Sequence, residues 1–339
     1  MEKKWSTNDL VKLFKLKDAT KTPLIYAEKN NEIPKAHRVP RGKVSVRKWD
    51  TSQLPEIGTK FGFLSRPETQ IIVDIYTPKG GTGKTTFAAN FSRIAAINGI
   101  KTLVCGLDFQ KSITKYIAPE PEITSIDEIE EKPLLGLHHL LFEGANTNEV
   151  ILKTEIPTLD IIPETGDLNF MAKKIRLETR KEYFFKENLI PKLNEYDLII
   201  FDGNPGWSDL TENALVSSTD LIMPISCNVG CYNALKENLG EIEKFRNAMK
   251  FSWDHFYMLP TMLINTSISQ NVYARYLNSY SNAVIPIPVR HSTIAEESHA
   301  AGLSTLEYDP SSPLANDYYD IIVALWSKIC PKNKDDRNV

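Results

Sequence analysis

Two lysines stand five residues apart in the stretch Ile75–Asn90, which reads IYTPKGGTGKTTFAAN. A strict phosphate-binding loop has the pattern G-x-x-x-x-G-K-[ST]; Lys84 fits it, but Pro78 stands where the first glycine belongs. Glycines let a backbone turn sharply and approach an anion without a Cβ clash, and the stretch holds Gly80, Gly81 and Gly83. The second lysine, Lys79, has no place in the strict pattern and needs a separate explanation.

The loop lies where a phosphate site is expected, after the apolar run Ile71–Tyr76 and before a helix-forming segment. Free N–H groups and the positive end of the helix dipole favour a bound anion there. In such a loop Lys84 contacts the β- and γ-phosphates of a nucleotide, and the Thr85 hydroxyl ligates Mg²⁺. The residues expected to bind nucleotide are Gly80, Gly81, Thr82, Gly83, Lys84, Thr85 and Thr86. A glycine-rich turn that binds nothing is the alternative.

Two carboxylates follow at the ends of apolar runs. Asp202 ends LIIFD, where an aspartate holds the Mg²⁺ shell through water, and Asp108 ends TLVCGLD, where it can orient an attacking water. One aspartate at a strand end is usually a turn residue, but a pair favours function, because open α/β sheets bind ligands at that edge. We therefore expect Lys84, Asp108 and Asp202 to be catalytic, with Thr85 and (through water) Asp202 holding the metal.

These residues need a scaffold, and the sequence from Ile71 onward predicts strands that alternate with helices. Strands are expected at 71–76, 101–108, 196–203, 220–226, 256–265 and 283–289, and helices at 85–100, around 212–217, at 233–250 and at 315–329. The strands are apolar throughout, which is typical of a mainly parallel sheet covered by helices on both faces.

Residues 1–65 differ from the rest in charge. They hold 14 Lys and Arg against 7 Asp and Glu, a net charge of +7, whereas the whole 339-residue chain carries −3. A basic segment on an acidic body suits a polyanionic partner, although a solvated basic surface is the plainer reading. Two helices are expected, beginning near Ser6 and Pro23, followed by a hairpin over 36–50. Helix, turn, helix and basic wing is a DNA-reading arrangement.

From Ile71 to Ile329 the chain resembles the ParA/MinD family of ATPases. KGGTGKTT matches that family's deviant Walker A motif, which begins K-G-G and does not require the earlier glycine; GLDFQ resembles its D-x-D-P-Q segment, and DGNPG its Walker B tail. The resemblance implies that Lys79 is the signature lysine, a catalytic cation that reaches across a dimer interface to the partner's nucleotide.

The resemblance also bears on the base and the rate. No N-K-x-D guanine signature is present, which favours ATP, and Asn265 and Pro288 lie in segments that resemble the family's adenine-contacting ones. Two positions depart from the family pattern: Gly106 replaces the first aspartate of D-x-D, and Asn204 replaces one proline of the Walker B tail. The family hydrolyses slowly until a partner stimulates it, and Gly106 leaves the unstimulated rate open.

The basic segment carries a second resemblance. IPKAHRVPRGKVSVRKW is similar to the wing of MerR-like winged helix-turn-helix domains, and the larger partition ATPases carry such a module ahead of the ATPase. We expect a DNA-binding module at 1–65 and an α/β P-loop NTPase domain of ParA type at 66–339. The candidate DNA contacts are Arg38, Arg41, Lys43, Arg47, Lys48 and, on the body, Arg290. A regulatory or dimer-forming module is the alternative.

The C-terminal helix helps to decide which branch of the family this chain resembles, because MinD-like members end in a membrane-binding amphipathic helix. Here an apolar stripe is followed by Pro331, Asp335 and Asp336, a poor anchor for anionic lipid, so we expect the helix to pack in the core. The N-terminus lacks an apolar signal region and no run of about 18 apolar residues occurs, so we expect a cytoplasmic protein with no membrane partner. The family resemblance implies that it is associated with the nucleoid.

The sequence therefore predicts a DNA-segregation ATPase for a plasmid or chromosome. The resemblance implies a homodimer with ATP and Mg²⁺, DNA binding in that state, and hydrolysis stimulated by a ParB-like centromere-binding protein. Autorepression through the basic module is a further expectation. Two alternatives remain open: a MinD- or flagellar-type membrane-positioning ATPase, and a transcription regulator with a nucleotide-sensing domain.

Overall fold

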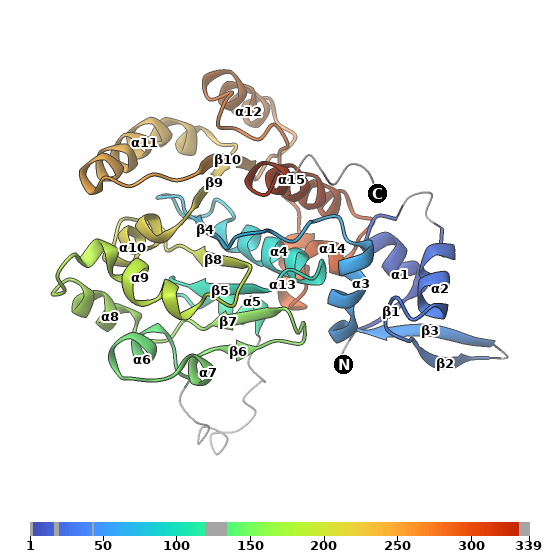
Figure 1. The fold of residues 1–339 in the computed structure, drawn as a ribbon. Helices are drawn as coiled ribbons and strands as arrows, with labels where there is room; N and C mark the ends of the chain where they lie inside the picture. The colour runs from blue at the N-terminus through green and yellow to red at the C-terminus, as the bar shows by residue number, and fades with distance from the viewer. Residues whose placement is uncertain (1–2, 17–19, 43, 119–133, 332–339) are drawn as a thin grey trace, which may run out of the picture.

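The computed structural model of the chain describes residues 3–16, 20–42, 44–118 and 134–331. A small N-terminal module, here the described residues up to 65, lies beside a larger α/β body (Figure 1). The module's antiparallel sheet has the order β1-β3-β2 and is accompanied by three helices. Its elements are β1 (Lys4–Ser6), α1 (Thr7–Leu13), α2 (Thr22–Lys29), β2 (His37–Arg41), β3 (Val44–Asp50) and α3 (Leu54–Phe61).

Local sequence accounts for most of the module. Ser6 caps α1 reciprocally: its hydroxyl accepts the N–H of Asp9 at 3.3 Å, and the Asp9 carboxylate accepts the N–H of Ser6 at 2.7 Å. The expected hairpin is present as β2 and β3. Trp5 and Trp49 stand opposite each other on β1 and β3, both fully buried, and anchor a core that sequence periodicity alone does not reveal.

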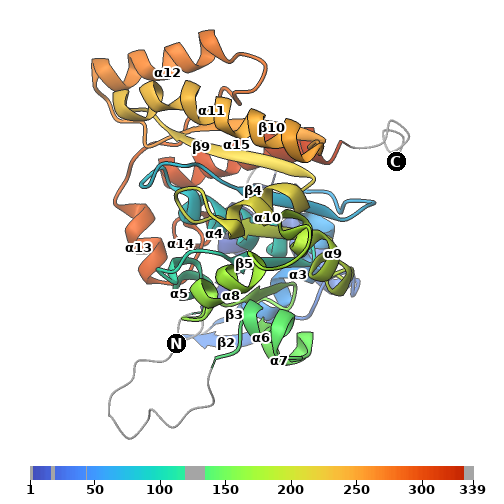
Figure 2. The same cartoon turned by 90° about the vertical axis from the view of Figure 1, so that its left-hand side faces the viewer.

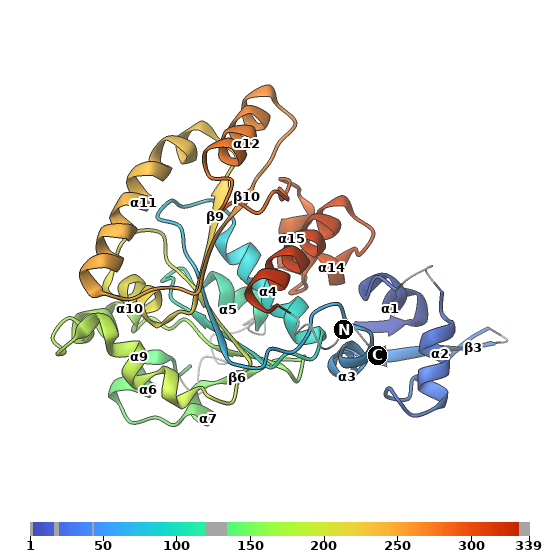
Figure 3. The same cartoon turned by 45° about the horizontal axis from the view of Figure 1, so that its top comes forward.

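The module is docked on the body through α3, an element that the sequence analysis does not predict. Gly58 of α3 lies so close to the end of α4 (Lys84–Ile97) that a Cβ there would come within 1.8 Å of the Ile97 carbonyl oxygen. The Asn98 side-chain oxygen accepts the N–H groups of Phe63 and Leu64 at 2.6 and 3.1 Å. Figure 3 shows α3 lying between the module's sheet and α4.

The body contains a seven-stranded sheet in the order β10-β9-β4-β8-β5-β7-β6, in which every pairing except β6–β7 is parallel. The expected mainly parallel sheet is thus confirmed. Two strands at one edge, β6 and β7, are not predicted from the sequence. The strands are β4 (Ile71–Ile75), β5 (Thr102–Gly106), β6 (Leu152–Lys153), β7 (Leu159–Ile162), β8 (Leu198–Asp202), β9 (Asp220–Ser226) and β10 (His255–Thr261).

Helices cover both faces of the sheet (Figures 1 and 2). One face packs on α4, α5 and α15 and the other on α6, α8, α9 and α10, while α11 and α12 cover the β9–β10 end. Besides α4, the helices are α5 (Ser112–Ile117), α6 (Leu137–Phe142), α7 (Thr147–Val150), α8 (Leu168–Ile175), α9 (Phe184–Asn188), α10 (Asp209–Ser217), α11 (Val229–Met249), α12 (Ser267–Ser279), α13 (Ile294–Ala300), α14 (Thr305–Tyr308) and α15 (Pro313–Ile329).

One expected strand is wrong. Residues 283–289 run along β10 but join it only through isolated bridges, such as that between Met258 and Val284. The Ile285 and Val289 N–H groups donate to Met258 and Pro260 of β10 at 3.0 and 2.8 Å, but the Ile287 N–H turns to the Ile285 carbonyl oxygen at 2.8 Å. Pro260 has no N–H to return, so the ladder is interrupted between the two contacts.

The C-terminal helix packs as expected. Its apolar stripe is buried in the core of the body: Ile321, Ile322, Leu325, Trp326 and Ile329 are each at most 6% exposed. Within the described ranges, no helix has both the length and the apolar character needed to cross a membrane.

The α3–α4 contact generates a stability prediction. Gly58→Ala should destabilise the protein by about 1–3 kcal/mol, because the added methyl overlaps the Ile97 carbonyl and forces the helices apart. Gly240→Ala, in α11 with open space around it, is the matched control and should stabilise by about 0.5–1 kcal/mol. Urea unfolding measures both. Equal, stabilising effects of the two substitutions would contradict the close packing.

Candidate nucleotide site

The glycine loop connects β4 to the start of α4, as the strand–loop–helix order predicts. Gly81 and Gly83 have φ values of +71° and +81°, a left-handed conformation that other residues rarely adopt. The Thr261 hydroxyl of β10 donates to the carbonyl oxygen of Thr82 at 2.8 Å and holds the loop against the sheet. The first N–H groups of α4 are thereby directed at one point, where an anion is favoured.

Lys84 is the first residue of α4, and its side chain folds back over the loop. Its Nζ donates to the Lys79 carbonyl oxygen at 3.2 Å, and the residue is 7% exposed. Burial lowers the pKa of this ammonium, while the carboxylates of Asp202, Asp108 and Asp74 oppose that shift. The amine is thus placed among carboxylates at the mouth of the loop, as expected for a phosphate-binding lysine.

Thr85 and Asp202 meet as the metal prediction requires. The Thr85 hydroxyl donates to Asp202 Oδ2 at 2.8 Å, and the other oxygen, Oδ1, is buried with no hydrogen-bond partner among the described residues. Burial, reinforced by the charges of Glu164 and Asp108, raises the pKa of Asp202 to about 8. A hydroxyl and a carboxylate with a free oxygen fit a hydrated Mg²⁺ ion, whose charge would keep that carboxylate ionised.

Asp74, the fourth of the five residues of β4, is a carboxylate that the sequence analysis misses. It is fully buried, and neither of its oxygens has a hydrogen-bond partner in the described part of the chain. Burial and then the nearby Asp202 charge raise its pKa well above the ordinary value. Its position inside an apolar strand gave no sign of this, because it is not at a strand end.

Asp108 lies two residues beyond the end of β5, so the strand is shorter than expected but delivers it to the same edge. Its backbone N–H donates to Glu164 Oε1 at 3.3 Å. Glu164 follows β7 and is fully buried; burial above all raises its pKa to about 7, with hydrogen bonds from Thr114 and Asp108 opposing. The sequence offered a signal for Glu164, since it stands just after the apolar run LDII.

Lys79 points away from its own loop. The residue is exposed, and its Nζ lies against the start of α11, where a Cβ on Gly230 would come within 2.8 Å of it. An ammonium gains nothing electrostatically at the positive end of a helix. The Lys79 side chain is exposed at the surface, with its ammonium beside the start of α11.

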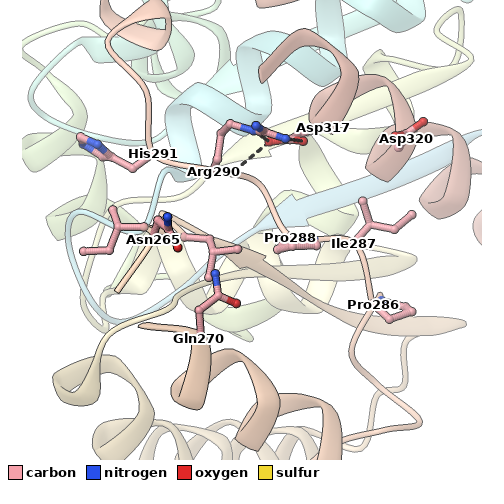
Figure 4. Close-up of a pocket in the computed structure, with 11 residues that line it drawn as sticks. Asn265, Gln270, Pro286, Ile287, Pro288, Arg290, His291, Asp317 and Asp320 are labelled. Atoms are coloured by element: carbon pink, nitrogen blue, oxygen red, sulfur yellow. Dashed lines mark hydrogen bonds and ion pairs between the residues drawn. The ribbon is translucent and has the colours of Figure 1, made fainter. Parts of the chain in front are cut away.

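Asn265 and Pro288, the candidate adenine residues, do converge. They line one cavity of about 700 Å³ together with Gln270, Arg290 and His291 (Figure 4). A smaller cavity of about 170 Å³ shares Arg290 and His291 and is also lined by Gly83 and Thr86 of the glycine loop. The two cavities thus extend from the phosphate loop towards Asn265 and Pro288, a path suited to a nucleotide's sugar and base.

Arg290, a candidate DNA contact, is engaged within the body. Its guanidinium forms a two-pronged ion pair with Asp317 of α15, with distances of 2.6 and 2.8 Å (Figure 4). Such a pair is a strong, geometrically specific contact. The structure therefore places Arg290 at the wall of the cavity, with part of its charge neutralised.

The basic residues of the hairpin lie in different environments. Arg47 and Arg38 both pair with Glu28 of α2, and Lys48 lies 3.8 Å from Asp9. Arg41, at the tip, is exposed and forms no ion pair within the described ranges. Lys43 falls outside the described residues. The hairpin tip consequently keeps the most available charge.

Comparison with known proteins agrees with this geometry. Residues 69–253 match the family model described as AAA domain. The chain is 25% identical to the cell division protein PomZ of Myxococcus xanthus, covering 75% of this chain and 76% of that protein. It is 26% identical to the sporulation initiation inhibitor protein Soj of Bacillus subtilis, covering 74% and 96%.

A solved structure, that of a Cyanothece McdA variant in complex with ATP, shares the fold. Its TM-score is 0.66 at 16% identity, and the match covers 76% of this chain and 96% of that one. The family match extends over more than half of the chain and contains the glycine loop, Asp108 and Asp202. The chain therefore belongs to this AAA-domain family and, by its loop and its relatives, to the ParA/MinD group of ATPases.

Proposed function

We propose that this protein is a partition ATPase that dimerises with ATP and Mg²⁺, binds DNA in that state, and releases it after hydrolysis. The observation that carries the proposal is the convergence of Lys84, Thr85 and Asp202 at the opening of α4, with Lys79 left exposed on the same loop. ATP and Mg²⁺ are the cofactors that a ParA/MinD site takes. The family resemblance adds a ParB-like stimulating partner.

The chemistry follows from the positions of the side chains. Lys84 and the α4 N–H groups bind and orient the phosphates, and Lys79 of a second subunit supplies charge where negative charge develops. Thr85 and Asp202 would hold Mg²⁺, whose positive charge would offset the negative charge of the phosphates. Asp108 orients the water that attacks. Catalysis of this kind rests on positioning and electrostatics rather than on covalent intermediates.

DNA binding is proposed for the N-terminal module, and its basic hairpin supports this. The module also offers a means of autorepression if it recognises an operator next to the partition genes. The module's α3 packs on the end of α4, and the glycine loop lies at the start of α4. The proposed DNA-binding and nucleotide-binding parts therefore contact opposite ends of one helix. Binding to DNA would place the protein on the nucleoid.

The burial of the α15 stripe argues against the membrane-positioning alternative. A helix with Ile321, Leu325 and Trp326 in the core has no free apolar face to place in lipid.

The transcription-regulator alternative differs from our proposal in the rate of ATP hydrolysis. It predicts operator binding with negligible ATP hydrolysis even when a partner is present.

Lys84→Ala should weaken ATP binding by roughly 10- to 100-fold, because it removes charge-assisted hydrogen bonds to the phosphates. Isothermal titration with Mg²⁺-ATP measures this. Lys244→Ala, an exposed lysine on α11, is the control and should bind as the wild type does. Unchanged affinity in Lys84→Ala would refute the site.

Lys79→Ala should bind ATP within a few-fold of the wild type but lose ATP-dependent dimerisation or turnover, because the exposed ammonium serves the neighbouring subunit. Light scattering after size exclusion, with ADP and ATP, reports the mass. A variant that dimerises and hydrolyses normally would show that the role in trans is wrong.

DNA binding is tested by titrating the full-length protein onto duplex DNA with no nucleotide, ADP or ATP at several salt concentrations. ATP should strengthen binding, and Arg41→Ala should reduce the slope of log K against log salt by about one, as expected for one lost phosphate contact. Lys244→Ala serves again as the control. The proposal would be contradicted if neither ATP nor Arg41→Ala changed the affinity for DNA or its salt dependence.

A further inference from the structure

The Glu164 side chain fills the space that a side chain at position 106 would occupy. A Cβ built on Gly106 would lie 2.3 Å from Glu164 Cγ and 2.6 Å from its carboxyl carbon, so a side chain at 106 and the present Glu164 exclude each other. Ile113 Cγ2, at 2.7 Å, is the other atom that such a Cβ would meet. β5 and β7 are adjacent parallel strands, and Glu164 follows β7 where Gly106 ends β5. The carboxylate beside the end of β5 therefore comes from the neighbouring strand.

The Glu164 carboxylate is bound on both sides by backbone. Oε1 accepts the N–H of Asp108 at 3.3 Å, and Oε2 accepts the N–H of Thr114 in α5 at 3.2 Å. The N–H of Glu164 itself donates to the Thr114 hydroxyl at 2.9 Å. A fully buried carboxylate thus joins the Asp108 loop to α5 at the carboxyl edge of the sheet.

We propose that Glu164 is the residue that positions Asp108 for ATP hydrolysis, acting from β7 because Gly106 leaves room for it. Asp108 stands on a loop, and its own carboxylate accepts the N–H of Gln110, within that loop, at 3.1 Å. The hydrogen bond from the Asp108 backbone to Glu164 holds this loop against the segment after β7, next to the hydrogen bond of 3.0 Å from the Leu107 N–H to the Asp202 carbonyl oxygen. This inference rests on the proposed ATPase activity.

The test removes the carboxylate at position 164, after β7, and introduces one at position 106, at the end of β5. Hydrolysis of Mg²⁺-ATP by the full-length protein is measured for each variant. Glu164→Ala should lower kcat by roughly 10- to 100-fold, as expected for a displaced reactive group, while ATP affinity stays within a few-fold. Adding Gly106→Asp to that variant returns a carboxylate to the vacated space, with a shift of the Ile113 methyl group, and should recover much of the rate. Gly106→Leu in the same background fills a similar volume but offers the backbone N–H groups no acceptor, and should not.

Glu149→Ala is the matched control. Its carboxylate also accepts a backbone N–H, that of Asn146 at 2.7 Å, but at the start of α7. This variant should lose only a little stability and keep kcat. Should Glu164→Ala fail to fold, Glu164→Gln carries the test, since its amide nitrogen cannot accept one of the two N–H groups; its kcat should fall about tenfold.

The outcomes separate the two proposals. A wild type that shows no turnover in single-turnover assays with labelled ATP, with or without DNA, would overturn the ATPase proposal and this inference with it. A wild type that hydrolyses ATP beside an equally active Glu164→Ala would overturn only the role of Glu164. Equal rescue by Gly106→Asp and Gly106→Leu would reduce that role to packing.

Discussion

Helix α4 begins with backbone N–H groups that no carbonyl of the helix can satisfy, and the protein leaves them open to an anion. Nearly all the rest of this 14-residue helix is buried. In its second half the fully buried Arg93 pairs with Glu307 of α14 at 2.7 Å and with Glu155, between β6 and β7, at 2.6 Å, which fixes the helix against both segments. A buried ion pair must be well formed to offset its desolvation, so the position of α4 is strongly specified. The geometry of Lys84 and Thr85 depends on that placement.

The same helix joins the two parts of the chain. Its first residue belongs to the glycine loop, and its last, Ile97, receives α3 of the N-terminal module. Fourteen residues of α-helix extend over about 21 Å, and such a packed helix moves as a unit. The module is therefore seated on the helix that begins at the glycine loop. This arrangement gives the basic hairpin a physical connection to the nucleotide site.

Acidic groups gather at the carboxyl edge of the sheet, where burial first and mutual repulsion second act on their charges. Burial and mutual charge raise the pKa of Asp202 to about 8 and that of Asp74 well above its ordinary value. Like charges held together in a buried place need cations. Lys84 supplies one, and the Thr85–Asp202 pair is placed to recruit another in Mg²⁺. Glu164 adds a further carboxylate, one that lies outside the motifs recognised in the sequence.

Local sequence determined the glycine loop, the positions of Asp108 and Asp202 after apolar strands, the parallel sheet and the N-terminal hairpin, because each depends on short-range periodicity, turns and caps. Tertiary structure alone decided the contacts between distant segments. It seated Gly58 on Ile97, brought Glu164 over Gly106 and paired Arg290 with Asp317. It also broke the expected strand at 283–289. The order of residues along the chain shows which side chains are apolar and how they are spaced. Which distant side chain each of them meets depends on the order of the strands in the sheet.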